Sequence, residues 1–224
     1  MNIALNTSHD FLVALRHGDR RTAFRVVDEA VDAGAGLDHI YINVVQPAMR
    51  EIGRLWQENE LTVAEEHLAT AIVQSAMSRT FERVFVWRDS RTPLLIASCA
   101  DAEQHQIGLR MLCDLLEMCG WDTIYLGASV PVESLVDLVR KHQPAAVAIS
   151  ATIAPNVSRV RVAIAAIRAA ELANQPMVAV GGRVFLSDPA MAKRVGADFT
   201  ASDAVEAVRI LEEGVRRGQR STAE

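Results

Sequence analysis

Short apolar runs alternate strictly with helical patterns over residues 94–217, and this alternation limits the fold of the 224-residue chain more than any other feature. Continuous apolar strands that alternate with amphipathic helices predict a doubly wound parallel sheet, of the Rossmann or flavodoxin-like type. Strands are predicted at residues 94–98, 123–126, 145–150, 177–181 and 198–200, and helices at 105–119, 131–142, 157–173, 189–194 and 203–217.

The first 90 residues have a helical period instead, and short links between the helices favour a four-helix bundle. Asp19 is placed to cap the second helix, and Thr62 with Glu65 forms a capping box at the start of the fourth. Pro47 should kink the third helix, because proline cannot donate a backbone hydrogen bond to the Asn43 carbonyl. The four helices are predicted at residues 8–17, 19–34, 37–56 and 62–81.

A polar segment at residues 88–93 separates the two patterns, so we expect an all-α domain over residues 1–90 and an α/β domain over residues 91–224. The net charge of −5 argues against a basic nucleic-acid surface. The three cysteines form no CxxC pair, and the sequence shows neither a signal peptide nor an apolar run of transmembrane length. We therefore expect a cytoplasmic protein that does not contact a membrane.

Residues with useful chemistry follow three of the predicted strands, where a doubly wound sheet binds its ligands. A carboxylate two residues before a histidine can hold one imidazole nitrogen while the other faces a metal. Glu103 is the carboxylate that precedes His105 in this way, and Asp101 is a competing partner. The residues at the strand ends are Glu103, His105, Gly108, Ser150, Thr152, Gly181 and Gly182.

The spacing of these residues, with 41 residues between Gly108 and Ser150, resembles that of a cobalamin-binding domain in which a protein histidine replaces the cofactor's own benzimidazole on cobalt. The resemblance covers residues 92–216 and implies that His105 is the lower axial cobalt ligand. Glu103 stands where the family has aspartate, and its longer arm keeps the carboxylate that would bind His105. The resemblance also implies a slot for the nucleotide tail, lined by Gly108, Ser150, Thr152, Gly181 and Gly182.

A second motif lies in the predicted bundle, where Trp56 is followed after nine residues by Glu66 and His67. It resembles the Trp-x9-Glu-His signature of CarH- and LitR-type adenosylcobalamin light sensors, in which a helical bundle covers the upper corrin face. The resemblance implies that all three residues bind the cofactor, although Trp56 also continues an apolar stripe that would suit core packing. Gln57 stands where those sensors have a second histidine, so His39, His67 or water would have to be the upper ligand after photolysis.

These resemblances imply a stand-alone, photocobilin-like photoreceptor rather than an enzyme. Light would break the cobalt–carbon bond of adenosylcobalamin, and the bundle would then change conformation or association to signal to a protein effector. We expect a homo-oligomer without direct nucleic-acid contact, because no DNA-binding segment precedes the module in this sequence. A bilin remains open as a second chromophore, and it would be held noncovalently because all three cysteines lie outside the predicted bundle.

Other functions fit parts of the same pattern. A corrinoid methyl-carrier protein of a methyltransferase system has the same helical-plus-Rossmann plan and is the main alternative. A mutase cobalamin subunit would not need its own helical cap. Cys99 as a catalytic nucleophile is the weakest alternative, because the sequence offers no companion residues for it.

Overall fold

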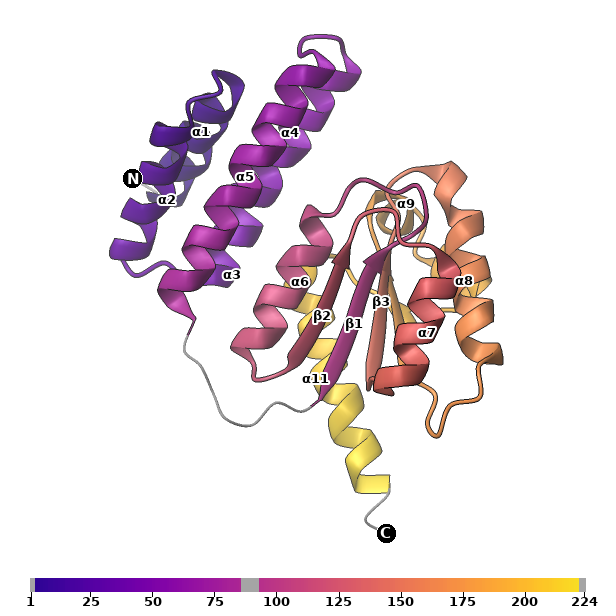
Figure 1. Cartoon of the computed structure of the whole chain (residues 1–224). Coiled ribbons are helices and arrows are strands. Elements are labelled where there is room, and N and C mark those ends of the chain that lie inside the picture. Colours follow the sequence, from indigo (N-terminus) through magenta and orange to yellow (C-terminus); the bar gives the residue numbers. More distant parts are fainter. Residues whose placement is uncertain (1–2, 86–92, 222–224) are drawn as a thin grey trace. The chain divides into compact units, whose positions relative to one another are not determined.

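Two units make up the chain, Met1–Val86 and Trp87–Glu224, and each is described by itself. The computed structural model describes residues 3–85 and 93–221 (Figure 1). The predicted domain boundary between residues 90 and 91 lies outside the described residues.

The first unit is all helical, as the sequence predicts (Figure 1). Both predicted caps are present: the Asp19 side chain accepts from the Thr22 N–H, and Thr62 and Glu65 form the reciprocal capping box. The first helix begins at Ile3 rather than at residue 8. The helices are α1 (Ile3–Arg16), α2 (Arg20–Asp32), α3 (Leu37–Ile40), α4 (Gln46–Gln57) and α5 (Val63–Val84).

Pro47 changes the hydrogen bonding of the long third helix, which the structure divides into α3, a π-helical segment at Tyr41–Val45, and α4. The Gln46 N–H donates to the Tyr41 carbonyl, five residues back instead of four. In a π-helical turn of this kind, the carbonyls near the proline ring accept from N–H groups five residues ahead instead of four. The structure therefore shows a wider turn just before Pro47, and the predicted kink of the helix axis stays a prediction.

The second unit contains one five-stranded sheet in the order β2-β1-β3-β4-β5, with parallel pairing throughout, so the predicted fold class is confirmed. The strands are β1 (Leu94–Cys99), β2 (Asp122–Gly127), β3 (Ala146–Ser150), β4 (Met177–Gly181) and β5 (Phe199–Thr200). The helices are α6 (Ile107–Met118), α7 (Val132–His142), α8 (Val157–Ala169), α9 (Arg183–Ser187), α10 (Ala190–Val195) and α11 (Ala204–Ser221).

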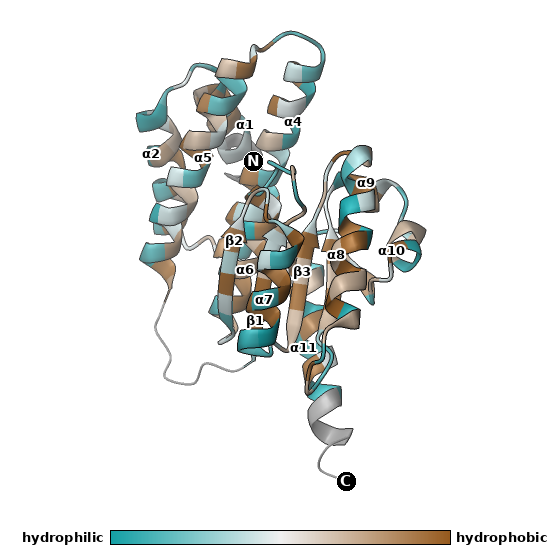
Figure 2. Ribbon diagram, turned by 45° about the vertical axis from the view of Figure 1, so that its right-hand side comes forward, coloured by the Kyte–Doolittle hydropathy of each residue, from teal (hydrophilic) through white to brown (hydrophobic). Residues whose placement is uncertain are grey.

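Helices cover both faces of this sheet, and the apolar colouring of β3 in Figure 2 follows from its burial between them. Side chains of α7 and α8 pack on one face, together with Ile96, Val147 and Val178 from the strands. Helix α6 packs against β1 and β2, while α11 packs against α6 and β4. Within residues 3–85 and 93–221, the structure shows no helix with the length and apolarity needed to cross a membrane.

In the second unit, the predictions differ from the structure at several helix ends and at one short helix. Helix α6 begins at Ile107 rather than at residue 105, which leaves His105 in the loop, and α8 ends at Ala169 rather than at residue 173. The short helix α9 was not predicted, because five residues carry too little periodic signal.

Candidate functional site

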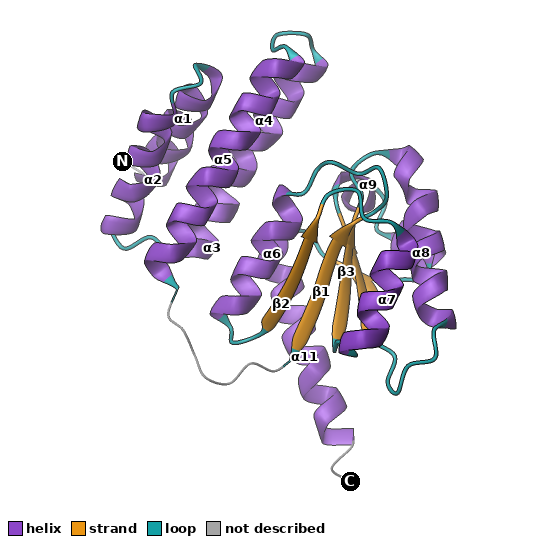
Figure 3. Ribbon diagram, in the orientation of Figure 1, coloured by secondary structure: helices purple, strands orange, loops and turns teal. Residues whose placement is uncertain are grey.

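The residues that the sequence singled out in the second unit follow the carboxyl ends of β1, β3 and β4, and Figure 3 shows the loops at this edge of the sheet. Cys99, Ser150 and Gly181 are register partners across β1, β3 and β4. Register partners point to the same face of a parallel sheet. These three therefore form a row of small side chains on the face opposite the cluster under α7 and α8.

His105 lies in the loop between β1 and α6 and is held by Glu103. Its Nδ1 lies 2.5 Å from Glu103 Oε1, and its backbone N–H donates to the same oxygen at 3.0 Å. Since an ionised carboxylate only accepts, Nδ1 carries the proton in this pair. The His105 side chain is 51% exposed. Nε2 is therefore the nitrogen by which this ring would bind a metal.

The other oxygen of Glu103 reaches across to the segment that follows β3. Oε2 accepts from the Thr152 N–H at 2.7 Å and from Asn156 Nδ2 at 2.9 Å. Burial by itself raises the pKa of Glu103, but the hydrogen bonds from His105, Thr152 and Asn156 outweigh it and bring that pKa down to about 2. Glu103 is thus an ionised, fully buried carboxylate that joins two loops.

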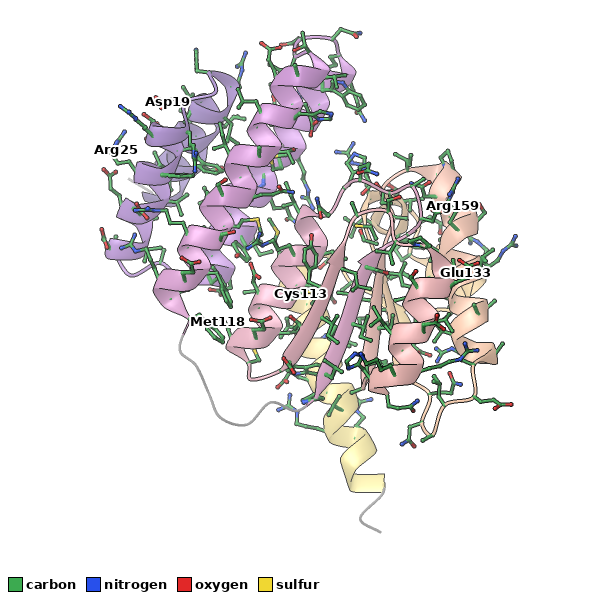
Figure 4. All side chains as sticks on the ribbon, viewed as in Figure 1. Asp19, Arg25, Cys113, Met118, Glu133 and Arg159 are labelled. Carbon is green, nitrogen blue, oxygen red and sulfur yellow. The ribbon has the colours of Figure 1, made fainter. Side chains whose placement is uncertain are left out.

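Asp101, the competing partner predicted for His105, is engaged elsewhere. Its carboxylate lies 2.6 Å from Arg159 of α8, and Arg159 is labelled in Figure 4. Asp101 is partly exposed, whereas Glu103 is buried. The pairing of Asp101 with the histidine is therefore wrong, and Glu103 has that role.

The sequence did not reveal two residues that hold the loop of residues 100–106, here called the His105 loop. The first is Asn156, which is 3% exposed and donates to Glu103. The second is Ser129 in the loop between β2 and α7, which bonds to the backbone of Ala102 and Glu103. The only feature of the sequence that could have pointed to Asn156 and Ser129 is that each is a polar residue shortly after a predicted strand.

Further contacts hold the end of the His105 loop that leads into α6. The thiol of Cys99 lies 3.7 Å from the His105 carbonyl, and the Tyr125 hydroxyl donates to Gln106 Oε1 at 2.9 Å. Burial, with the nearby charge of Glu103, raises the pKa of the Cys99 thiol to about 12. A thiol that stays protonated at neutral pH is a poor nucleophile. The burial and the raised pKa of Cys99 therefore do not support a catalytic role for it.

The two neighbouring glycines, Gly181 and Gly182, have different reasons to be glycine. Gly182 has a φ of +103°, and a Cβ there would lie 2.1 Å from the Ala151 carbonyl oxygen, so the backbone itself requires glycine. A Cβ on Gly181 or on Gly108 would meet no atom within 4 Å. A small side chain at these two positions would therefore meet no neighbouring atom, and the slot for the nucleotide tail stays a prediction.

In the bundle, Trp56 lies in the last turn of α4 and is 40% exposed, whereas Ile52 and Leu55 of the same helix are buried. Core packing does not explain this tryptophan. On α5, Glu66 Oε2 lies 2.6 Å from His67 Nδ1, and Glu66 Oε1 accepts from the Thr70 hydroxyl at 2.8 Å. The structure thus gives this motif an exposed indole and a carboxylate–imidazole pair in one unit.

The candidate upper ligands also lie in this unit. Gln57 is exposed at the end of α4, and His67 has a side chain that is 74% exposed. His39 lies in α3, where its Nδ1 is 3.2 Å from Asn43 Nδ2. Among the described residues there is no group of three or more His, Cys, Asp or Glu side chains that would hold a metal.

Comparison with known proteins agrees with this arrangement. A family model described as "B12 binding domain" matches residues 93–209, and a second model of the same description matches residues 7–80. The chain is 26% identical over 191 residues to monomethylamine corrinoid protein 1 of Methanosarcina acetivorans, which covers 83% of this chain and 87% of that protein. It is 27% identical over 184 residues to the HTH-type transcriptional repressor CarH of Myxococcus xanthus, covering 82% of this chain and 60% of the repressor.

Among solved structures, the monomethylamine corrinoid protein of Methanosarcina barkeri has the same fold, with a TM-score of 0.78 and 21% identity. The match covers 93% of this chain and 98% of that one. The order of a helical unit and a parallel-sheet unit is therefore shared along nearly the whole length of both chains.

Proposed function

The chain belongs to the B12-binding family, and from that premise we propose that it is a light sensor that holds adenosylcobalamin between a lower histidine ligand and its helical bundle. Adenosylcobalamin supplies a cobalt–carbon bond that visible light breaks. The rest of the proposal concerns what the residues of this chain do around that bond, and what changes when the adenosyl group leaves.

We assign the lower ligand to His105, which would bind cobalt through Nε2. Glu103 keeps the proton on Nδ1 and fixes the plane of the ring, because its own carboxylate is anchored by Thr152 and Asn156. A metal-bound histidine with such a carboxylate partner is a better donor and is held in one tautomer. The nucleotide tail of the cofactor would enter a slot lined by Gly108, Ser150, Thr152, Gly181 and Gly182.

The single observation that carries the sensor proposal is the exposure of Trp56. A large indole that is 40% exposed, in the same unit as the Glu66–His67 pair, suits packing against an adenosyl group better than packing into the bundle. Glu66 and His67 offer polar atoms for the ribose and adenine. Loss of the adenosyl group would remove these contacts in one state only, which is what a switch requires. A partner protein or self-association would carry the signal, and a noncovalent bilin remains an optional second chromophore.

A corrinoid methyl carrier is the second candidate. The observation that favours it is the match to the monomethylamine corrinoid protein of Methanosarcina acetivorans, which extends over 87% of that protein, against 60% of CarH. A carrier needs an upper face that a partner enzyme can reach, and methylcobalamin would be its natural ligand. Neither candidate function requires the chain to be an enzyme on its own.

Illumination of the loaded chain separates the two candidates. We expect the full chain to bind adenosylcobalamin in darkness, and green or blue light to remove the alkylcobalamin absorption bands. Sedimentation should change in parallel, because the contacts of Trp56 and Glu66 are lost. Binding of methylcobalamin with exclusion of the adenosyl form would overturn the sensor and favour the carrier.

A matched pair of histidine variants tests the ligand assignment. His105→Ala should lose the histidine-bound visible spectrum of cobalamin, whereas His67→Ala should keep it in darkness. An unchanged spectrum in His105→Ala would show that cobalt takes its lower ligand elsewhere.

A further inference from the structure

We propose that Ser129, in the loop between β2 and α7, is a positioning residue for the cobalt ligand and acts by clamping the His105 loop from the neighbouring strand end. This inference rests on the cobalamin site of the proposed function but not on its light response.

The clamp consists of two hydrogen bonds, one to the side-chain hydroxyl of Ser129 and one from its backbone N–H. Ser129 Oγ accepts from the Ala102 N–H at 3.1 Å, and the Ser129 N–H donates to the Glu103 carbonyl at 2.9 Å. The two atoms it holds lie three and two residues before His105 in the chain. Ser129 therefore fixes the backbone from which the Glu103–His105 pair extends.

The backbone conformation indicates that the hydroxyl itself is needed. Ser129 has a φ of +52° and Ala102 a φ of +60°, and both values lie in the left-handed region that disfavours residues with a Cβ. Glycine would adopt this conformation without steric cost. A serine at position 129 keeps an acceptor oxygen that glycine lacks, and that oxygen satisfies the Ala102 N–H.

The clamp completes a support on two sides of β1, which lies between β2 and β3 in the sheet. The Glu103 carboxylate is tied to the β3 side by Thr152 and Asn156. The Glu103 main chain is tied to the β2 side by Ser129. With both sets of hydrogen bonds in place, the His105 ring would be held in one position relative to the sheet. Without the hydrogen bonds of Ser129, Nε2 would sample a wider range of positions.

The test uses the full chain and compares three replacements at one position with a control. Ser129→Ala and Ser129→Gly both remove the acceptor, but only glycine also relieves the left-handed strain. Ser129→Asn restores a side-chain oxygen in a residue that tolerates positive φ. The control is Ser187→Ala, because the Ser187 hydroxyl makes a local bond to the Arg183 carbonyl within α9.

Two readouts report positioning rather than folding. In the protein loaded with cob(II)alamin in darkness, nitrogen splitting in the electron paramagnetic resonance spectrum measures the ratio of histidine-bound to histidine-free cobalt. We expect that ratio to fall about fivefold in Ser129→Ala and Ser129→Gly, as for the loss of one neutral hydrogen bond, and to recover in Ser129→Asn. In the cofactor-free chain, amide hydrogen exchange at Ala102 should be faster in the same two variants.

The possible outcomes distinguish a failure of the Ser129 role from a failure of the proposed function. If Ser129→Gly matches the unmodified chain in both readouts, Ser129 has only a conformational role and the inference is overturned. Because glycine relieves strain, this variant decides the matter even if Ser129→Ala does not fold. If the unmodified chain binds no cobalamin, the proposed function itself fails, and the positioning role fails with it.

Discussion

Two histidines of this chain pair Nδ1 with a nearby carboxylate, at 2.5 Å for His105 and 2.6 Å for His67, but the two pairs are supported very differently. Glu103 is fully buried, and its carboxylate accepts from its own loop and from the segment that follows β3. Glu66 has a side chain that is 24% exposed and accepts from His67 and Thr70, both on its own helix.

The difference in burial and support suits the Glu103–His105 pair and the Glu66–His67 pair to different roles. A carboxylate held by several segments has one position, which suits a ligand that keeps its metal in every state of the protein. A pair on one exposed helix can turn and exchange partners at little cost, which suits contacts that exist in one state of a switch. The same side-chain chemistry is therefore suited to the proposed fixed ligand in one unit and to the proposed adaptable contact in the other.

The largest expected effect comes from deleting each carboxylate. Glu103→Ala leaves the part-buried Thr152 N–H and the buried Asn156 amide without their acceptor, so we expect the free energy of unfolding to fall by about 3–5 kcal/mol. Glu66→Ala breaks a partly exposed pair within one helix and should cost about 0.5 kcal/mol. Urea denaturation of the cofactor-free variants measures both values. Equal losses would show that burial does not distinguish the two pairs.

Acid should act on the buried pair in a defined pH range. The pKa of Glu103 is lowered from 4.5 to about 2 in the folded chain, so the folded state favours the ionised form. The resulting stability is fully present above about pH 5 and is lost as the pH falls from about 5 to about 2, amounting to about 3 kcal/mol. Glu103→Gln should flatten this part of the stability profile, and Glu66→Gln should leave it intact. A profile that Glu103→Gln does not alter would contradict the lowered pKa.

Sequence reasoning succeeded where the relevant contact is local. The caps at Asp19 and Thr62 and the pairing of Glu103 with His105 each involve residues two or three apart. The placement of Ser150 and Gly181 in one row follows from the general rule that the carboxyl ends of parallel strands lie together. Local spacing and sheet topology were therefore sufficient for these residues.

The same reasoning failed for contacts between distant segments. Asn156 reaches Glu103 over 53 positions in the sequence, and Ser129 reaches Ala102 over 27. Neither polar residue has a spacing that marks it, because the contact depends on how neighbouring loops fold over the strand ends. Asp101 was a competing partner for His105 in the sequence, and the structure instead pairs it with Arg159.

His67→Ala should give the smallest change in stability. It is also the sharpest test of the Glu66–His67 pair. The His67 side chain is 74% exposed, so its removal should change the free energy of unfolding by less than about 0.5 kcal/mol. If the Glu66–His67 pair contacts the adenosyl group, affinity for adenosylcobalamin in darkness should fall about fivefold, while affinity for hydroxocobalamin should stay the same. The control is His17→Ala, another exposed histidine of the bundle, whose Nδ1 donates to the Val13 carbonyl at 2.9 Å. Equal losses for the two cobalamins would contradict a contact to the adenosyl group, and His67 would then either support the bundle or bind cobalt itself. The two histidine pairs would then differ only in their burial.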